Sequence, residues 1–312
     1  MAAPMNICVL GGTGFVGTAL INRLAQQGHW VNVPTRDPEL HQGLRVLATV
    51  RLIRANVYDA RVLDRLVDGA DAVVNLIGIL NEHGRNTFQH VHADLATKLV
   101  AAMKAGRVRR LLHMSALGAD PQGPSAYLRS KGEAEAQVRA AADHLDFTIF
   151  RPSVIYGPGD SLTNRFAGLL RLSRGWLPLV RARARFAPVY VGDVADAFVH
   201  VLHDRNTFGQ TYELGGPEVM TLEQIVRTTA AFARLPCRIL RLPDVLGRLQ
   251  GIVMGWIPGK PFTLDNFRSL TRDSICAEDG FTRLGLPRHR MMEILPTYLT
   301  PQAAPKTIAA AI

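Results

Sequence analysis

The amino-acid sequence predicts an α/β protein built on a Rossmann-like, doubly wound parallel sheet, and three observations support this prediction. Short runs rich in valine, isoleucine and leucine recur through the first half of the 312-residue chain. Segments of helical length, with apolar residues three and four positions apart, separate these runs. A glycine-rich turn joins the first run to the first helical segment. Such alternation favours parallel strands with right-handed helical crossovers and a ligand crevice where the strand order reverses.

The individual elements follow from the same patterns. We expect buried strands at residues 7–10, 30–33, 51–53, 72–77, 110–114 and 147–150. Helices are expected at residues 15–27, 61–68, 88–105 and 127–143. Beyond Arg151, proline and glycine interrupt the pattern, so only shorter elements are expected, near residues 188–191 and 211–214.

This order of elements predicts two unequal parts. Residues 1–160 are expected to form an NAD(P)-binding Rossmann domain, to which some strands between 186 and 216 return. Residues 161–300 are expected to form a smaller, mostly helical substrate or partner region, and residues 301–312 a flexible tail. An apolar segment at residues 251–258 is interpreted either as a core helix or as a membrane-facing patch, and the core helix is favoured.

Composition and charge limit the class of protein. Hydrophobic residues make up 47% of the chain and charged residues 20%, which excludes a disordered chain. The 36 lysines and arginines exceed the 26 acids by ten, so we expect an anionic partner, although not nucleic acid, for which no module is present. One block carries arginines and no acid, and it is either a binding surface for an anionic substrate, an acidic lipid or an acidic protein, or a solvated face: Arg165, Arg171, Arg174, Arg181, Arg183 and Arg185.

The cysteines and the start of the chain bear on the compartment. Three cysteines without ligand spacing and the lack of a secretory signal predict a reducing cytoplasm, with peripheral contact at the inner face of a membrane left open. His90 and His92 diverge on a helix, so we expect no metal site from them.

Glycines at three spaced positions mark a dinucleotide loop. Gly11, Gly14 and Gly17 lie between the first strand and the first helix, where glycine allows a tight turn and a close approach of the backbone to a pyrophosphate. The start of that helix favours an anion through its backbone N–H groups and its dipole. The loop therefore predicts a nucleotide cofactor.

The end of the second strand predicts which cofactor. Arg36 stands where an acid would bind the ribose 2′-hydroxyl of NAD. A guanidinium there pairs with a 2′-phosphate, so NADP(H) is the preferred cofactor. NAD(H) remains an alternative, because Asp37 would bind the ribose if the register shifted by one residue.

Three polar residues form the candidate catalytic group. Tyr127 and Lys131 are four positions apart and share one face of a helix, while Ser115 ends the preceding strand. A tyrosine has a pKa of about 10, and a neighbouring ammonium favours its phenolate. Such a tyrosine can exchange a proton with a carbonyl or alcohol while hydride moves to or from nicotinamide.

These motifs resemble the short-chain dehydrogenase/reductase superfamily, in its extended and atypical branches, which include the NAD-dependent epimerase/dehydratase proteins. The resemblance rests on GGTGFVG at 11–17, HMSALGA at 113–119, YLRSK at 127–131 and RPSVIYGPGD at 151–160. With ANVYD at 55–59, NLIGIL at 75–80 and TYELGGPE at 211–218, the sequence is most similar to bacterial relatives of the NADPH-binding accessory subunit of mitochondrial respiratory complex I.

The resemblance implies roles for individual residues. It assigns the catalytic positions to Ser115, Tyr127 and Lys131. The implied cofactor contacts come from five segments: Gly11, Thr13, Gly14, Phe15, Val16 and Gly17 at the pyrophosphate, Arg36 at the adenosine phosphate, Asn56 at the adenine, Ile77 and Gly78 at the ribose, and Pro152, Ser153 and Val154 at the nicotinamide.

Three functions remain open at this point. The first is an NAD(P)H-binding oxidoreductase that acts on a carbonyl or alcohol. The second is a non-turnover NADPH-binding subunit or assembly partner of a respiratory, NADH:quinone oxidoreductase-like membrane complex. A nucleotide-sugar epimerase or dehydratase is third, because the MSALGA segment departs from the Ser-Ser or Ser-Thr pairs of those enzymes.

Overall fold

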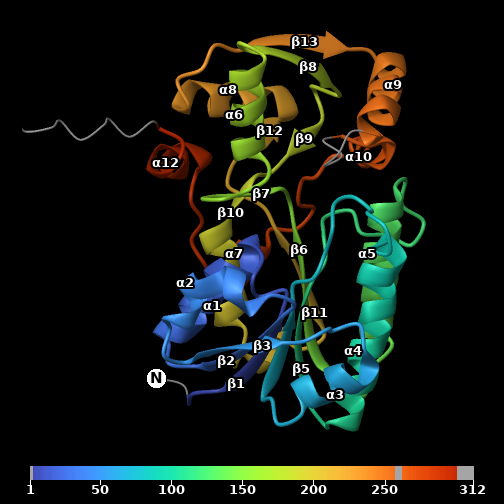
Figure 1. The fold of residues 1–312 in the computed structure, drawn as a ribbon, viewed down its shortest axis with the longest axis vertical. Helices are drawn as coiled ribbons and strands as arrows, with labels where there is room; N and C mark the ends of the chain where they lie inside the picture. Colours follow the sequence, from blue (N-terminus) through green and yellow to red (C-terminus); the bar gives the residue numbers. More distant parts are fainter. Residues whose placement is uncertain (1–2, 257–261, 301–312) are drawn as a thin grey trace, which may run out of the picture.

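The computed structural model describes residues 3–256 and 262–300. Its centre is a seven-stranded parallel sheet (Figure 1). The strand order is β11 (Gln210–Leu214), β6 (Asp146–Pro152), β5 (Arg110–Met114), β4 (Ala72–Asn75), β1 (Asn6–Leu10), β2 (Trp30–Thr35) and β3 (Val50–Arg54). The order reverses between β4 and β1, so the predicted doubly wound sheet is confirmed. In sheets of this kind a ligand binds at the carboxyl ends of the two strands where the order reverses.

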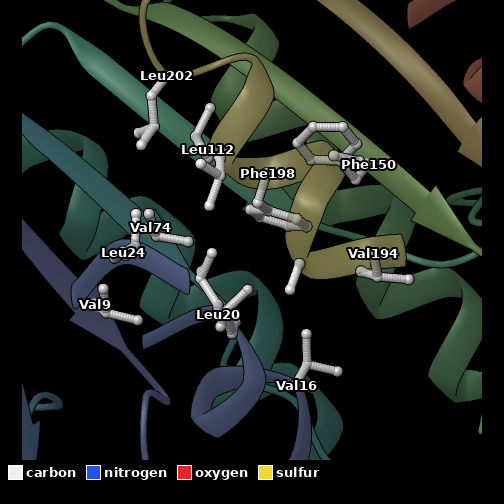
Figure 2. Packing of buried hydrophobic residues seen from close by; sticks show 14 of the residues in the cluster. Val9, Val16, Leu20, Leu24, Val74, Leu112, Phe150, Val194, Phe198 and Leu202 are labelled. Carbon is white, nitrogen blue, oxygen red and sulfur yellow. The ribbon is translucent and has the colours of Figure 1, made fainter. Parts of the chain in front are cut away.

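Helices cover both faces of this sheet. On one face α1 (Phe15–Gln26) packs beside α7 (Val191–His200), and leucines and valines from both helices meet the strands around Phe150 and Phe198 (Figure 2). The opposite face carries α3 (Ala60–Val67), α4 (Leu95–Ala105) and α5 (Ala126–Arg139). Short helical turns lie at Pro38–His41, at α2 (Gln42–Arg45) and at Arg205–Thr207.

The remaining elements form a second region beyond the carboxyl edge of the sheet (Figure 1). Its helices are α6 (Thr163–Leu172), α8 (Leu222–Phe232), α9 (Asp244–Gly255) and α10 (Leu264–Ser269). Three two-stranded ribbons accompany them: β7 (Ile155–Tyr156) with β10 (Val189–Tyr190), β9 (Arg185–Phe186) with β12 (Met220–Thr221), and β8 (Trp176–Val180) with β13 (Arg238–Leu242). Near the end of the chain follow α11 (Gly280–Leu284), α12 (Met291–Ile294) and the turn Leu295–Thr297.

Several elements differ from their sequence-based expectation. The helix expected at 88–105 begins with a π-helical turn, Gln89–Asp94, and α5 ends at Arg139 rather than at 143. α7 was not expected, because it follows β10 without an intervening loop and no side chain caps it. The tail at 301–312 lies outside the described residues.

Helix α9 corrects another expectation. Only Gly247 and Gly251 of this helix are buried, while Ile252 and Val253 are 50% and 55% exposed and Trp256 is 87% exposed. The core-helix interpretation is therefore wrong for residues 251–256; positions 257 and 258 lie outside the described residues. Within those residues, no helix is both long and apolar enough to cross a bilayer.

Candidate active site and cofactor cleft

The glycine loop between β1 and α1 is a compact turn whose open side is the start of α1. Gly11 has a φ of +77°, and a Cβ on Gly17 would lie 2.4 Å from the Gly11 carbonyl oxygen, so both positions require glycine. Gly14 caps α1, and neither a side-chain cap nor an acid in the first turn occupies that helix start. Thr13 and Phe15 are half-buried in the loop, whereas the Val16 side chain packs in the core.

The end of β2 presents an arginine to solvent. Arg36 directly follows β2, and in the described part of the chain its guanidinium makes no ion pair or hydrogen bond. The neighbouring Asp37 carboxylate lies 3.8 Å from the Arg54 guanidinium. Arg36 is therefore the cation available to a ligand at this edge, while Asp37 already faces a cation.

The loops after β3 and β4 border the same crevice. Asn56 follows β3, and its side-chain oxygen accepts the Tyr58 N–H at 3.2 Å in a local turn. Ile77 follows β4, and its N–H donates to the Asn75 side chain at 3.2 Å. Gly78 comes next, and a Cβ there would lie 3.1 Å from Lys131 Nζ, so the β4 loop touches the candidate catalytic lysine.

The segment after β6 is used partly for structure. Pro152 is buried at the end of β6, and Val154 is half-buried. The Ser153 hydroxyl donates to the Ser274 carbonyl oxygen at 2.7 Å and accepts the Ala187 N–H at 3.2 Å. This side chain therefore holds the second region against the sheet, and the Ser153 N–H is also used, because it donates to the Leu214 carbonyl oxygen at 2.9 Å.

Ser115 and Tyr127 carry hydroxyls that make no hydrogen bond within the described residues. Ser115 follows β5 and is 4% exposed, and its buried Oγ has no hydrogen-bond partner. Tyr127 lies in the first turn of α5, where its hydroxyl makes no hydrogen bond to any described residue. Burial raises the pKa of Tyr127 to about 12. A buried hydroxyl without a partner, such as that of Ser115, is unusual in a native fold, and both hydroxyls are available to a substrate oxygen.

Lys131 is buried one turn beyond Tyr127. It is 4% exposed, and its ammonium donates to the carbonyl oxygen of Met114 at 3.1 Å, next to Ser115. Burial lowers the pKa of Lys131 to about 8, against the opposing effect of Glu135. In this state the lysine lies beside the serine, and it does not lower the pKa of Tyr127 as expected from the sequence.

His92 completes the polar group, although no role for it was expected from the sequence. Its Nε2 accepts the Ile79 N–H at 3.1 Å, so the proton lies on Nδ1, which faces Ser130 Oγ at 2.8 Å. Burial lowers the pKa of His92 to about 2, and the positive charge of Lys131 acts in the same direction to a smaller extent. The ring is therefore neutral, and it packs edge-on to Tyr127 with centroids 5.7 Å apart.

Asp265 of α10 is a second residue that sequence reasoning missed. Its carboxylate accepts the N–H groups of Ala126 at 2.7 Å and Tyr127 at 3.1 Å. A negative charge at the start of a helix interacts favourably with the positive end of the helix dipole, and a carboxylate there also accepts the N–H groups that have no partner within the helix. Asp265 is 138 positions from Tyr127, so no local pattern in the sequence indicates the contact.

A cavity of about 290 Å³ lies next to this group. Its walls come from the β4 loop, α9 and α10, and include Phe88, Ile252, Trp256, Leu264 and Asp265. The Phe88 ring lies 5.8 Å from the ring of Tyr127, measured between centroids. The cavity therefore reaches the surroundings of Tyr127 from the side of the second region.

The residues present fit a dinucleotide. The loop has no room for a Cβ at Gly17, and α1 begins without a side-chain cap. The Arg36 guanidinium at the end of β2 is unpaired among the residues that the structure describes. No group of three or more metal-binding side chains occurs in the described ranges. Fold and loop together define a nucleotide-binding α/β protein of the Rossmann type.

Comparison with known proteins identifies the family. A model of the NAD dependent epimerase/dehydratase family matches residues 7–215, and the chain belongs to this family. It is 31% identical over 301 residues to the mitochondrial NADH dehydrogenase (ubiquinone) 1 alpha subcomplex subunit 9 of Arabidopsis thaliana, covering 91% of this chain and 74% of that protein. It is 31% identical over 308 residues to a ceramide reductase of Caulobacter vibrioides, covering 96% of this chain and 87% of that protein.

Other relatives are longer. The chain spans 57% of the mitochondrial NADH-ubiquinone oxidoreductase 40 kDa subunit of Neurospora crassa, at 31% identity over 70% of this chain. Among solved structures, MoeE5 in complex with UDP-glucuronic acid and NAD superposes with a TM-score of 0.74 at 19% identity, covering 94% of this chain and 97% of that one. At this identity the likeness establishes the fold alone.

Proposed function

We propose that the protein is an NADP(H)-binding oxidoreductase of the short-chain dehydrogenase/reductase type, which interconverts a carbonyl and an alcohol. The observation that carries the proposal is a pair of hydroxyls that bond to no described residue, the buried Ser115 Oγ and Tyr127 Oη, in a family whose cofactor loop this chain has. Lys131, buried in the same helix as Tyr127, supplies the adjacent cation.

Each side chain has a distinct role in this proposal. When bound, the nicotinamide supplies or accepts the hydride equivalent. Ser115 donates a hydrogen bond to the substrate oxygen and orients it. Tyr127 gives a proton to that oxygen in reduction and takes it back in oxidation. The Lys131 ammonium stabilises the phenolate left on Tyr127, which requires it to leave the Met114 carbonyl.

NADP(H) is the proposed cofactor rather than NAD(H). Arg36 is free to pair with a 2′-phosphate, whereas Asp37 faces Arg54. The other proposed contacts are the glycine loop at the pyrophosphate, Asn56 at the adenine, Ile77 and Gly78 at the ribose, and the segment 152–154 at the nicotinamide.

The test is turnover by a conservative variant. Wild-type protein is supplied with NADPH and a panel of 2-decanone, cyclohexanone and decylubiquinone, and NADPH oxidation is followed by absorbance. Tyr127→Phe keeps the ring packing against Phe88 and His92 but removes the hydroxyl. We expect a loss of at least about 100-fold in rate with unchanged NADPH affinity. Undiminished oxidation in Tyr127→Phe would exclude the assigned role.

A second candidate is a non-turnover NADPH-binding subunit of a respiratory complex. The names of the relatives from Arabidopsis and Neurospora favour it, as does the resting geometry, in which Lys131 bonds to Met114 and burial raises the pKa of Tyr127. In this case the protein would retain NADPH without oxidising it and would occur in a large assembly at a membrane. The arginine block, Arg165, Arg171, Arg174, Arg181, Arg183 and Arg185, would then face the acidic partner or lipid.

A further inference from the structure

The exposed apolar side chains of the second region are concentrated on α9. Five of them, Val245, Leu249, Ile252, Val253 and Trp256, follow helical spacing and share one side of the helix. Their exposed fractions run from 50% at Ile252 to 87% at Trp256. We call these five residues the α9 stripe. A contiguous apolar stripe on a surface helix indicates a binding surface.

The packing of α9 fixes this stripe toward solvent. A Cβ on Gly247 would collide with the side chain of Val180, and a Cβ on Gly251 would lie 3.0 Å from the backbone nitrogen of Leu264. These two glycines therefore form the side of α9 that contacts β8 and α10. The stripe lies on the opposite side of the helix, and the described residues leave each of its five side chains at least 50% exposed.

Arginines border the α9 stripe. A second cavity, of about 370 Å³, lies between α9 and α10 and is lined by Arg181, Arg248, Arg268, Ile252 and Phe267, among others. Arg181 pairs with Asp244 at 2.5 Å. Arg248 and Arg268 are exposed and have no acidic partner among the described residues. A groove with apolar walls and unpaired guanidiniums suits an amphiphile with an anionic head group.

The neighbouring ribbon extends the same kind of surface. Trp176 of β8 and Leu240 of β13 are 54% and 57% exposed, and Arg238 stacks on the Trp176 ring at 5.2 Å. Exposed tryptophan and leucine with flanking arginine is the composition of elements that lie in the interfacial layer of a bilayer. At 12 residues, α9 is too short to cross one.

We propose that the α9 stripe docks the protein on the surface of a bilayer that contains anionic lipid, with Arg248 and Arg268 at the phosphate level. Unpaired positive charge beside the stripe favours an anionic bilayer over a second copy of this basic chain, whose matching surface would bring like charges together. Docking does not depend on turnover, so it stands apart from the proposed function.

One consequence does rest on the proposed function. Ile252 and Trp256 belong to the α9 stripe and also line the cavity of about 290 Å³, whose far wall includes Phe88 and Asp265. Both of these residues contact Tyr127. Docking through the stripe would thus direct the mouth of this cavity to the bilayer, so that a carbonyl or alcohol carried on a long apolar chain reaches Tyr127 from the membrane.

Sedimentation with vesicles tests the docking. Wild-type protein is mixed with vesicles of phosphatidylcholine alone or with 30% phosphatidylglycerol, and the bound fraction is measured. We expect binding to the anionic vesicles only, a drop of roughly tenfold or more in Leu249→Glu and Val253→Glu, and a smaller drop in Arg248→Glu. Val46→Glu, which changes an 81% exposed valine next to α2, is the matched control and should bind as wild type.

A second measurement uses the wild type and a conservative variant, so it does not depend on the folding of variants that place a glutamate in the α9 stripe. If the α9 stripe enters the interface, brominated phosphatidylglycerol quenches the tryptophan fluorescence of the wild type, and Trp256→Phe loses most of that quenching. Three outcomes would overturn the proposal: no binding to either vesicle, equal binding to neutral and anionic vesicles, or a dimer in solution that Leu249→Glu dissociates. None of them depends on NADPH oxidation, so failure of docking is distinct from failure of the enzyme proposal.

Discussion

The burial of Lys131 is unfavourable for folding. Its ammonium is buried with one backbone carbonyl as hydrogen-bond acceptor, and burial lowers its pKa to about 8. A charge in this setting opposes folding, because an ammonium in the unfolded chain is fully hydrated. A lysine with only a structural role would lie at the surface, so this position is consistent with a functional role.

Replacement of Lys131 should therefore stabilise the protein in a pH-dependent way. The folded pKa lies below the ordinary value of 10.5, so the unfolded chain binds more protons between about pH 8 and 10.5, and stability rises with pH in that window. Lys131→Met should raise the free energy of unfolding by about 1 to 3 kcal/mol at pH 7 and by much less near pH 10. Urea unfolding at the two pH values measures this.

Lys104→Met provides the control, because it removes an exposed lysine from the last turn of α4. Two results would contradict a destabilising charge on Lys131: a gain in the free energy of unfolding of Lys131→Met that is the same at both pH values, or a loss at both.

Sequence patterns located the central residues of the site but not their support. Tyr127 and Lys131 are one helical turn apart, and Ser115 follows a strand, so their local spacing in the sequence was enough to predict them as a group. His92 and Asp265 act through contacts that span distant parts of the chain, and such contacts leave no periodic signal. The raised pKa of Tyr127 could not be predicted from the sequence either, because it results from the burial of this residue in the fold.

At the scale of elements, α10 connects two sides of the candidate site. Asp265 holds the start of α5, and the Asn266 side chain donates to the Leu80 carbonyl oxygen in the β4 loop at 3.2 Å. Ser269 hydrogen-bonds Ser125, the N-cap of α5, at 2.9 Å. α10 therefore sets the position of Tyr127 relative to the β4 loop, and Asp265 is a positioning residue.

Asp265→Asn should separate positioning from stability. An amide can accept one of the two N–H groups but turns its own N–H toward the other. We expect turnover to fall about tenfold with an unchanged KM for NADPH, and unfolding free energy to fall by about 0.5 to 2 kcal/mol. Asp273→Asn is the control, because Asp273 also accepts a backbone N–H, from Arg185, away from Tyr127. Equal losses of turnover in both variants would indicate a general structural effect instead.

Elements were predictable where they have their own apolar pattern and punctuation. The first six strands along the chain overlap the predicted runs, because each is a short apolar-rich segment bounded by turns, although β3 has no buried residue. α7 follows β10 without a break, so it carries no boundary signal. The apolar spacing of α9 is the same whether its stripe meets a core or solvent, and the packing of Gly247 and Gly251 decides between them.

Across the whole molecule, the basic residues that make up the excess charge differ in their surroundings: some are buried or paired with acids, and others are unpaired among the described residues. Arg110 is only 5% exposed, and it donates to the carbonyl oxygens of Val201 and Asp146. Arg181 and Arg185 of the arginine block pair with Asp244 and Asp273. The net charge of +10 therefore does not form one free basic face, and an anionic partner must be sought at particular unpaired arginines.

Arg36 is one such residue, and it gives the cofactor crevice its proposed preference. It lies at the end of β2, far from α9, so its effect on binding can be measured without membranes or substrate (Figure 1). A guanidinium that pairs with a 2′-phosphate should contribute about 1.5 to 3 kcal/mol to NADPH binding and nothing comparable to NADH.

Isothermal titration of the wild type with NADPH and NADH measures whether this chain binds NADP(H) and prefers it to NAD(H). One NADPH should bind per chain at least about tenfold more tightly than NADH. Arg36→Ala should remove that difference, while Arg51→Ala, an exposed arginine on neighbouring β3, should preserve it. The assignment of NADP(H) as the cofactor is wrong if neither nucleotide binds, or if NADH binds more tightly than NADPH.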